Sequence, residues 1–142
     1  MRRRAHLPCR RAAGRGGWRR PGVMEAARKG GMRTPARQDL LEFSLHTIRL
    51  VRPLCEAIAR KDRDLASQVR RAMSSVALNL AEGFGNARGN ERLRLESARG
   101  SLYEAQAGVR VAVAWGILSE EQVAEALAAI DRLGGRVYGL VR

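Results

Sequence analysis

Apolar residues recur every three or four positions through most of the chain after residue 35, a spacing typical of amphipathic helices. The pattern predicts four helices, over about 36–60, about 64–82, about Asn90 to Trp115, and from Ser119 towards the C-terminal end. Short connections between helices make sequence neighbours antiparallel. The predicted fold is therefore all-α, an antiparallel up-down-up-down four-helix bundle over residues 35–142.

The apolar positions of each predicted helix indicate which side chains form the core. In the first helix they are Leu40, Leu41, Leu45, Ile48, Val51, Cys55, Ile58 and Ala59. In the second helix they are Leu65, Val69, Ala72, Met73, Val76 and Leu80. In the third helix they form a heptad-like seam suited to bundle packing, made of Leu95, Ala98, Leu102, Ala105, Val109, Ala112 and Gly116. In the fourth helix they are Val123, Leu127, Ile130, Val137 and Leu140.

Residues that favour helix starts mark three of the predicted boundaries. Thr34, followed by proline, is suited to cap the first helix, and either Asp62 or Asp64 the second. Ser119, with Gln122 three residues later, has the pattern of a capping box at the start of the fourth helix.

Proline and glycine predict where helices are interrupted. Pro53 falls inside the first helix, where its ring clashes with the carbonyl four residues earlier, so we expect a kink or a split there. Gly83 is expected to cap the end of the second helix, and residues 83–90 to form a turn. Gly134 and Gly135 each weaken the fourth helix by about 1 kcal/mol.

Charge is concentrated at the start of the chain. The 142 residues carry 27 Lys and Arg against 14 Asp and Glu, a net charge of +13. Residues 1–35 hold 11 of the basic residues and one acidic residue, for a net charge of +10, which leaves +3 for residues 36–142. The strong basicity therefore belongs to the first quarter of the chain rather than to the predicted bundle.

Residues 1–34 show no apolar periodicity and are rich in Arg and Gly, so they are predicted to be a disordered N-terminal extension. They contain no apolar run of the kind found in secretory signals. One interpretation is a basic arm that neutralises phosphates. The others are a tail without a partner, or sequence that precedes a translation start at Met24 or Met32.

Composition excludes several classes of protein. Only 4% of the residues are aromatic, which disfavours an all-β fold, and no apolar stretch is long enough to cross a membrane. Cys9 and Cys55 are too few for a disulfide framework or a four-cysteine zinc site, and neither His6 nor His46 has neighbours at metal-ligand spacing. We therefore expect no metal, no other cofactor, no membrane partner and a cytoplasmic location.

Polar residues form a row beside the apolar stripe of the second helix and a strip on the third. Seven of them are interpreted as a structural polar network: Gln68, Arg71, Ser75, Asn79, Glu82, Ser101 and Glu104. The carboxylates of Glu82 and Glu104 could instead perform acid–base chemistry. No His, Lys or Cys shares these rows, so the structural interpretation is preferred and the chain is predicted not to be an enzyme.

The strip on the third helix also includes Gly108 and Trp115. A fully solvated face rarely combines glycine with a large aromatic residue, so we expect this strip to contact another helix or another subunit. Our hypothesis is that this strip, with Gly108 beside Trp115, packs between subunits.

Three arginines share a separate face of the third helix, within about 20° of one another at 100° per residue: Arg92, Arg99 and Arg110. They are the candidate nucleic-acid-binding residues, because such a row can contact phosphates without reading sequence. A solvated face partly balanced by Glu91 and Glu96 explains the row equally well. The sequence shows little aromatic interleaving for base stacking.

Two motifs about 20 residues apart carry a resemblance to a known family. The segment 79–85 reads N-x-A-E-G-x-G, with Gln68, Arg71 and Ser75 before it, and residues 100–104 read G-S-L-x-E. Over about residues 38–140 the chain resembles bacterial four-helix-bundle proteins described from intervening sequences within 23S ribosomal RNA genes. It is also similar to the accessory variability proteins of diversity-generating retroelements.

The resemblance implies an up-down bundle that assembles into cyclic homopentamers and is not an enzyme. Because the retroelement relatives bind structured RNA and a reverse transcriptase, RNA or DNA and a protein of that kind are candidate partners. The expected function is a non-enzymatic, oligomeric, RNA-associated or scaffold module. The alternative is a protein–protein adaptor bundle without nucleic-acid binding, which the low charge of residues 36–142 favours.

Overall fold

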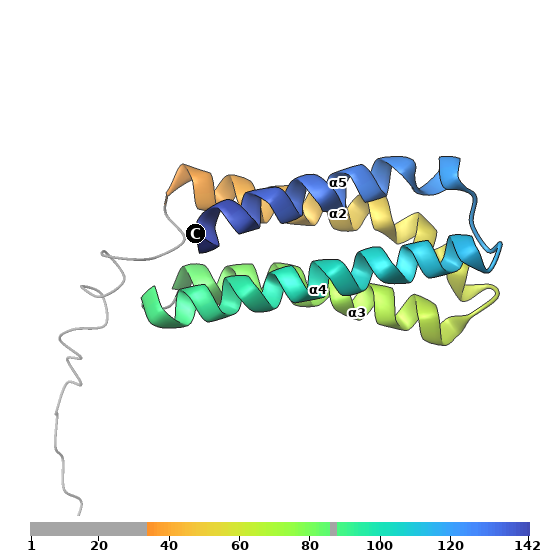
Figure 1. The fold of residues 1–142 in the computed structure, drawn as a ribbon, viewed down its shortest axis with the longest axis horizontal. Helices are drawn as coiled ribbons and strands as arrows, with labels where there is room; N and C mark the ends of the chain where they lie inside the picture. Colours follow the sequence, from red (N-terminus) through yellow and green to blue (C-terminus); the bar gives the residue numbers. More distant parts are fainter. Residues whose placement is uncertain (1–33, 86–87) are drawn as a thin grey trace, which may run out of the picture.

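Four helices pack side by side in the computed structural model (Figure 1). They are α2 (Pro35–Ala59), α3 (Arg63–Gly85), α4 (Arg88–Ala114) and α5 (Glu120–Val141). The structure describes residues 34–85 and 88–142, and all but the last residue of the disordered extension predicted over residues 1–34 lies outside them. Each helix packs against the next in sequence, and α5 packs back against α2. The predicted antiparallel four-helix bundle is confirmed.

The start of α3 and the start of α5 follow the capping signals in the sequence. Asp62 rather than Asp64 caps α3, because its Oδ1 accepts the backbone N–H of Leu65 at 2.9 Å. Ser119 and Gln122 form the predicted capping box, in which each side chain accepts a hydrogen bond from the other residue's backbone N–H. Both helices therefore begin where local side-chain acceptors satisfy N–H groups that have no partner inside the helix.

The first helix is continuous across its internal proline. α2 begins after Thr34, whose carbonyl oxygen accepts the N–H of Arg37 at 3.0 Å, and the split expected at Pro53 does not occur. Pro53 is exposed, so solvent can replace the hydrogen bond that its ring nitrogen cannot donate. On the opposite side of the helix, Val51 and Leu54 are buried in the core and hold the backbone in register.

The buried face of α2 is rotated from the predicted one. Ser44 and Thr47 are fully buried, whereas Leu41 and Leu45 are only partly buried. The Ser44 hydroxyl donates to the carbonyl of Leu41 at 2.7 Å, and the Thr47 hydroxyl donates to that of Phe43 at 2.8 Å. These hydrogen bonds offset the cost of burying the two hydroxyl groups. A pattern that counts only apolar residues does not predict that Ser44 and Thr47 are buried.

The end of α3 and the start of α4 lie closer together than predicted. Gly83 is buried inside α3, so its predicted role as a helix C-cap is wrong. A Cβ atom at this position would lie 3.3 Å from the Cβ of Arg94 and 3.5 Å from the carbonyl oxygen of Glu91. Glycine is therefore needed for close packing of the two backbones rather than for chain reversal. Because α4 begins at Arg88, most of the predicted turn is helical, and residues 86–87 lie outside the described residues.

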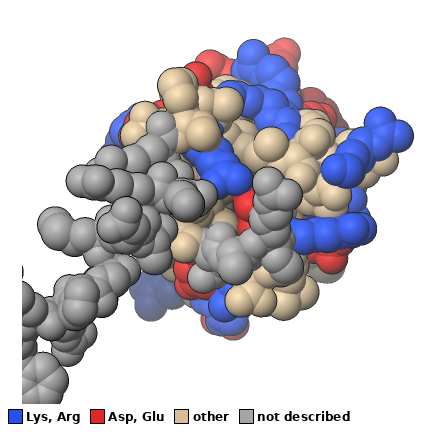
Figure 2. All heavy atoms as spheres, turned by 90° about the vertical axis from the view of Figure 1, so that its left-hand side faces the viewer, with Lys and Arg blue, Asp and Glu red and all other residues tan. Residues whose placement is uncertain are grey.

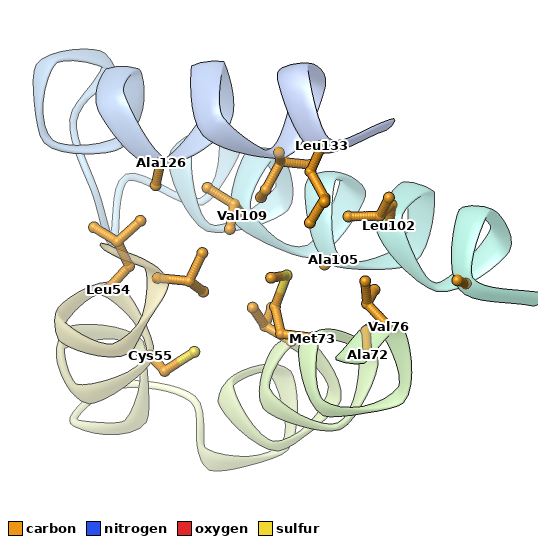
Figure 3. Close-up of a cluster of buried hydrophobic side chains, with 14 of the residues drawn as sticks. Leu54, Cys55, Ala72, Met73, Val76, Leu102, Ala105, Val109, Ala126 and Leu133 are labelled. Carbon is orange, nitrogen blue, oxygen red and sulfur yellow. The ribbon is translucent and has the colours of Figure 1, made fainter. Parts of the chain in front are cut away.

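One apolar core joins all four helices (Figure 3). Every predicted core position of α3 is buried, as is the α4 seam as far as Ala112, with exposed fractions of at most 3% in the seam. The prediction for α5 is less accurate, because Leu140 is 46% exposed and the buried positions include Ala126, Ala129 and Leu133. Among the described helices, none is both long and apolar enough to cross a bilayer.

Candidate functional site

Four residues of the predicted polar network meet where α3 packs on α4. The Ser101 hydroxyl donates to Ser75 Oγ at 2.9 Å, and Asn79 Nδ2 donates to the Ser75 carbonyl oxygen, also at 2.9 Å. Arg94, which the sequence analysis did not include, pairs with the Glu82 carboxylate at 3.0 Å and donates to Asn79 Oδ1 at 3.4 Å. Arg94 thus links the two polar rows, and only its place opposite Glu82 in the folded chain reveals it.

The other three members of the predicted network, Gln68, Arg71 and Glu104, are exposed to solvent. Glu82 is also half exposed, since 52% of its side-chain surface remains accessible beside Arg94. Ion pairs with that exposure contribute about 0.2–1 kcal/mol. The network is therefore a partly solvated set of polar contacts between α3 and α4.

Gly108 contacts α3 of the same chain. A Cβ atom on Gly108 would lie 2.5 Å from Cγ2 of Val69, a separation that side chains do not tolerate. Of the two expectations for this strip, the structure shows contact with another helix at Gly108, and packing of the strip between subunits stays a prediction. Trp115, on the same strip, is 77% exposed.

The outer face of α4, away from the core, carries a second stripe with alternating steps of four and three. Its members are Leu93, Ser97, Gly100, Glu104, Ala107, Val111 and Ala114, all of them exposed, and all but Ser97 and Glu104 are apolar or glycine. Leu93 and Val111 are 60% and 40% exposed, and Trp115 lies beside the end of the stripe. This spacing matches that of the buried seam on the opposite side of the helix, so α4 is suited to packing on two faces. We call this set of residues the outer stripe.

The three candidate arginines lie on the side of α4 that borders α5. Arg99 places its guanidinium 5.8 Å from the centre of the Tyr138 ring on α5. Arg92 pairs with Glu96 at 3.2 Å, with 71% of the arginine side chain exposed, and Arg110 is also exposed. The row therefore faces solvent along its length and meets α5 at its middle member.

A groove of about 410 Å³ runs between α4 and α5 beside this row. Its lining combines aromatic, polar and glycine positions from both helices: Arg99, Leu102, Tyr103, Gln106, Ile130, Asp131, Gly134, Gly135 and Tyr138. Arg142 lies at its edge, with its guanidinium 5.2 Å from the centre of the Tyr138 ring. Sequence reasoning placed Arg99 in the arginine row but predicted neither the groove nor the two tyrosines, because they come from two helices separated by a turn.

Positive charge gathers on the segments of α4 and α5 near this groove. Residues 88–101 and 131–142 together hold seven arginines against three carboxylates, a net charge of +4. At the same end of the bundle, the start of α2 and the end of α3 hold Arg37 against Asp39, Glu42 and Glu82. Figure 2, which views the end where α2 begins and α5 ends, shows more Lys and Arg surface than Asp and Glu surface. The modest net charge of the bundle is thus unevenly distributed.

A second groove, of about 600 Å³, lies between α2 and α3 and is lined by Cys55, Met73 and Arg70 among others. Burial raises the pKa of the Cys55 thiol above its ordinary value, although the charge of Arg70 opposes the shift. The thiol is therefore protonated at neutral pH and is a poor nucleophile.

His46 is exposed and stacks on Phe43. Within residues 34–85 and 88–142, no group of three or more His, Cys, Asp or Glu is placed to hold a metal ion.

Comparison with protein families gives one match. The family described as 23S rRNA-intervening sequence protein matches residues 36–139, most of the chain and nearly all of the bundle. This match confirms the resemblance to the intervening-sequence proteins, and the similarity to the retroelement proteins stays a prediction. No curated protein and no solved structure matches the chain.

Proposed function

Since the chain belongs to the 23S rRNA-intervening sequence protein family, we propose that it is a non-enzymatic, oligomeric bundle that binds RNA through the arginine face of α4 and α5. The observation that carries this proposal is the row of arginines on the side of α4 that borders α5, whose middle member, Arg99, lines the groove. Arg92, Arg99 and Arg110 come from α4, and Arg142 joins them from α5.

The arginine face is available to phosphates. The Arg92–Glu96 pair is exposed, so it contributes little and can exchange for a stronger contact with a phosphate. Arg99 and Arg142 rest on an aromatic ring rather than on a carboxylate, so their charge is not neutralised by that contact. Contacts of this kind give salt-dependent binding with little sequence preference.

Changing Arg92, Arg99 and Arg110 together to glutamine is expected to weaken RNA binding about tenfold at low salt. Three lost phosphate contacts on a single strand should also reduce the slope of log affinity against log salt by about 2. Glutamine preserves helix propensity, so the fold should be unaffected. Fluorescence anisotropy with a labelled RNA measures both quantities.

The matched control removes the same charge from another face, by changing Arg49, Arg52 and Arg60 of α2 to glutamine. These three arginines are also exposed. The control should bind RNA nearly as the unchanged protein does. Equal losses from both triple variants would contradict a defined arginine face, and RNA binding unaffected by either would favour the adaptor function.

The oligomeric part of the proposal rests on the outer stripe of α4. Apart from Ser97 and Glu104 its residues are apolar or glycine, and a second copy that presents the same stripe would cover the exposed side chains of Leu93 and Val111. The family resemblance makes a homopentamer the expected assembly. An unrelated protein covering the stripe would instead correspond to the adaptor function.

Replacing Val111 by glutamate is expected to reduce the mass of the assembly in solution, since a charge would then lie among Ala107, Ala114 and Trp115 at the apolar end of the stripe. Leu140→Glu is the control, because Leu140 has a similar exposure, 46% against 40%, but lies on α5. Light scattering after nuclease treatment separates protein assembly from bound nucleic acid. A monomeric unchanged protein at micromolar concentration would refute self-association.

A further inference from the structure

We propose that the groove between α4 and α5 holds an unpaired base of single-stranded RNA, stacked on Tyr103 and Tyr138, with the flanking phosphates on the surrounding arginines. This inference rests on the proposed function and adds to it the form of nucleic acid that is bound and the side chains that select it.

Two tyrosines from different helices open onto the same groove. Tyr103 of α4 is 64% exposed and Tyr138 of α5 is 45% exposed, and both line the cavity. Within the described residues, Tyr103 takes part in no stacking or cation–π contact. An exposed aromatic ring offers a stacking surface to any base, because every base has a π-face.

The arginines are positioned beside the rings rather than away from them. The guanidinium groups of Arg99 and Arg142 lie 5.8 Å and 5.2 Å from the centre of the Tyr138 ring. A guanidinium held by a ring keeps its charge and its hydrogen-bond donors, so it can contact a phosphate next to a stacked base. Base and phosphate would thus be bound by neighbouring groups of one site.

Two consecutive glycines keep the groove open. Gly134 and Gly135 line it, and a Cβ atom on either would meet no atom within 4 Å. Glycine weakens a helix, yet α5 is unbroken from Glu120 to Val141, so neither residue marks a helix end or a kink. The space that they leave, about 410 Å³, falls in the size range of sites that hold small molecules or single groups.

The polar groups inside the groove suit a base better than a phosphate. Gln106 Nε2 donates a hydrogen bond to Asp131 Oδ1 across the groove. An amide and a carboxylate can hydrogen-bond the edge of an unpaired base, whereas the carboxylate repels a phosphate. The base is therefore assigned to the interior and the phosphates to the rim with Arg99 and Arg142. In a duplex the bases are already stacked and paired, so we infer a preference for single strands.

The test compares binding of a fluorescein-labelled single-stranded oligouridine and of a duplex RNA of equal length to the full chain at several salt concentrations. Tyr103→Leu and Tyr138→Leu are each expected to weaken single-strand binding about fivefold or more, with little effect on the duplex. Tyr138→Phe keeps the ring and should bind as the unchanged protein does. Neither leucine variant should change the salt slope, because no phosphate contact is removed.

A second variant fills the groove without touching an aromatic ring. Gly134→Leu should weaken single-strand binding to a similar extent, while the melting temperature stays the same or rises, because the added side chain meets open space. Cross-linking of a 4-thiouridine oligomer followed by mass spectrometry should place the label at Tyr103 or Tyr138. This readout identifies the groove whatever residues 1–33 contribute to affinity.

The possible failures are distinguishable. If the unchanged chain binds neither the single-stranded RNA nor the duplex at low salt, the proposed function and this inference are both refuted. If it binds both RNAs and the arginine variants weaken binding, but the leucine variants bind the single strand normally, the proposed function stands and the base site is refuted. Equal losses on single strand and duplex, or cross-links confined to other helices, would also refute the base site.

Discussion

Replacing Gly108 by leucine is expected to lower the free energy of unfolding by about 3 kcal/mol, and the melting temperature by roughly 10–20 °C. Even the first carbon of the new side chain would overlap Cγ2 of Val69, which is itself fully buried on α3. The two helices would have to separate, and the hydrogen bond between Ser75 and Ser101 lies along the same contact. Thermal and urea unfolding followed by circular dichroism measure the loss.

Gly139→Leu on α5 is the matched control for this prediction. A Cβ atom on Gly139 meets nothing within 4 Å, and the residue is exposed and outside both the groove and the outer stripe. Because leucine is a better helix former than glycine, this variant should be as stable as the unchanged protein or slightly more stable. If the two variants have equal stability, the close contact between α3 and α4 is not what requires glycine at position 108.

Deleting residues 1–32 is expected to remove most of the salt dependence of RNA binding and to lower affinity at low salt by a factor of 100 or more. The deleted segment contains ten basic residues and one acidic residue. Each phosphate neutralised on a single strand adds about 0.7 to the slope of log affinity against log salt, so a fully engaged segment contributes roughly 6. Anisotropy titrations at four or five salt concentrations measure the slope.

We expect the deletion to leave the bundle intact, because the first helix begins at Pro35 and all the core residues in the described part of the chain follow it. The slope that survives should be about 2 and should depend on Arg92, Arg99 and Arg110. A truncated protein that retained the full slope would show that residues 1–32 make no contact with RNA. In that case the bundle itself would be the binding surface.

Residues of the family motif have structural roles that the folded chain explains. Asn79 bonds back to Ser75, and Glu82 pairs with Arg94 on the next helix. Gly83 allows close approach to α4, and Ser101 hydrogen-bonds to Ser75. The motif residues therefore stabilise the packing of α3 against α4. The candidate RNA site is separate from them and lies on the side of α4 that borders α5.

Sequence alone determined the features that depend on near neighbours in the chain. The four helices, their order and two of their caps follow from periodicity and from acceptors two or three residues away, as at Asp62 and Ser119. The buried seams of α3 and α4 were also predictable, because a helix that buries a face must place apolar residues on it.

Only the tertiary structure decided which residues from different helices meet. Gly83 and Gly108 look like helix breakers or surface positions in the sequence, and become packing sites because α3 and α4 approach closely. Arg94 gains its role from Glu82, and Tyr138 joins Arg99 across the boundary between α4 and α5. Such pairings depend on how whole helices are rotated and how far apart they lie. The packing of the entire core fixes these two quantities, and no local sequence pattern encodes them.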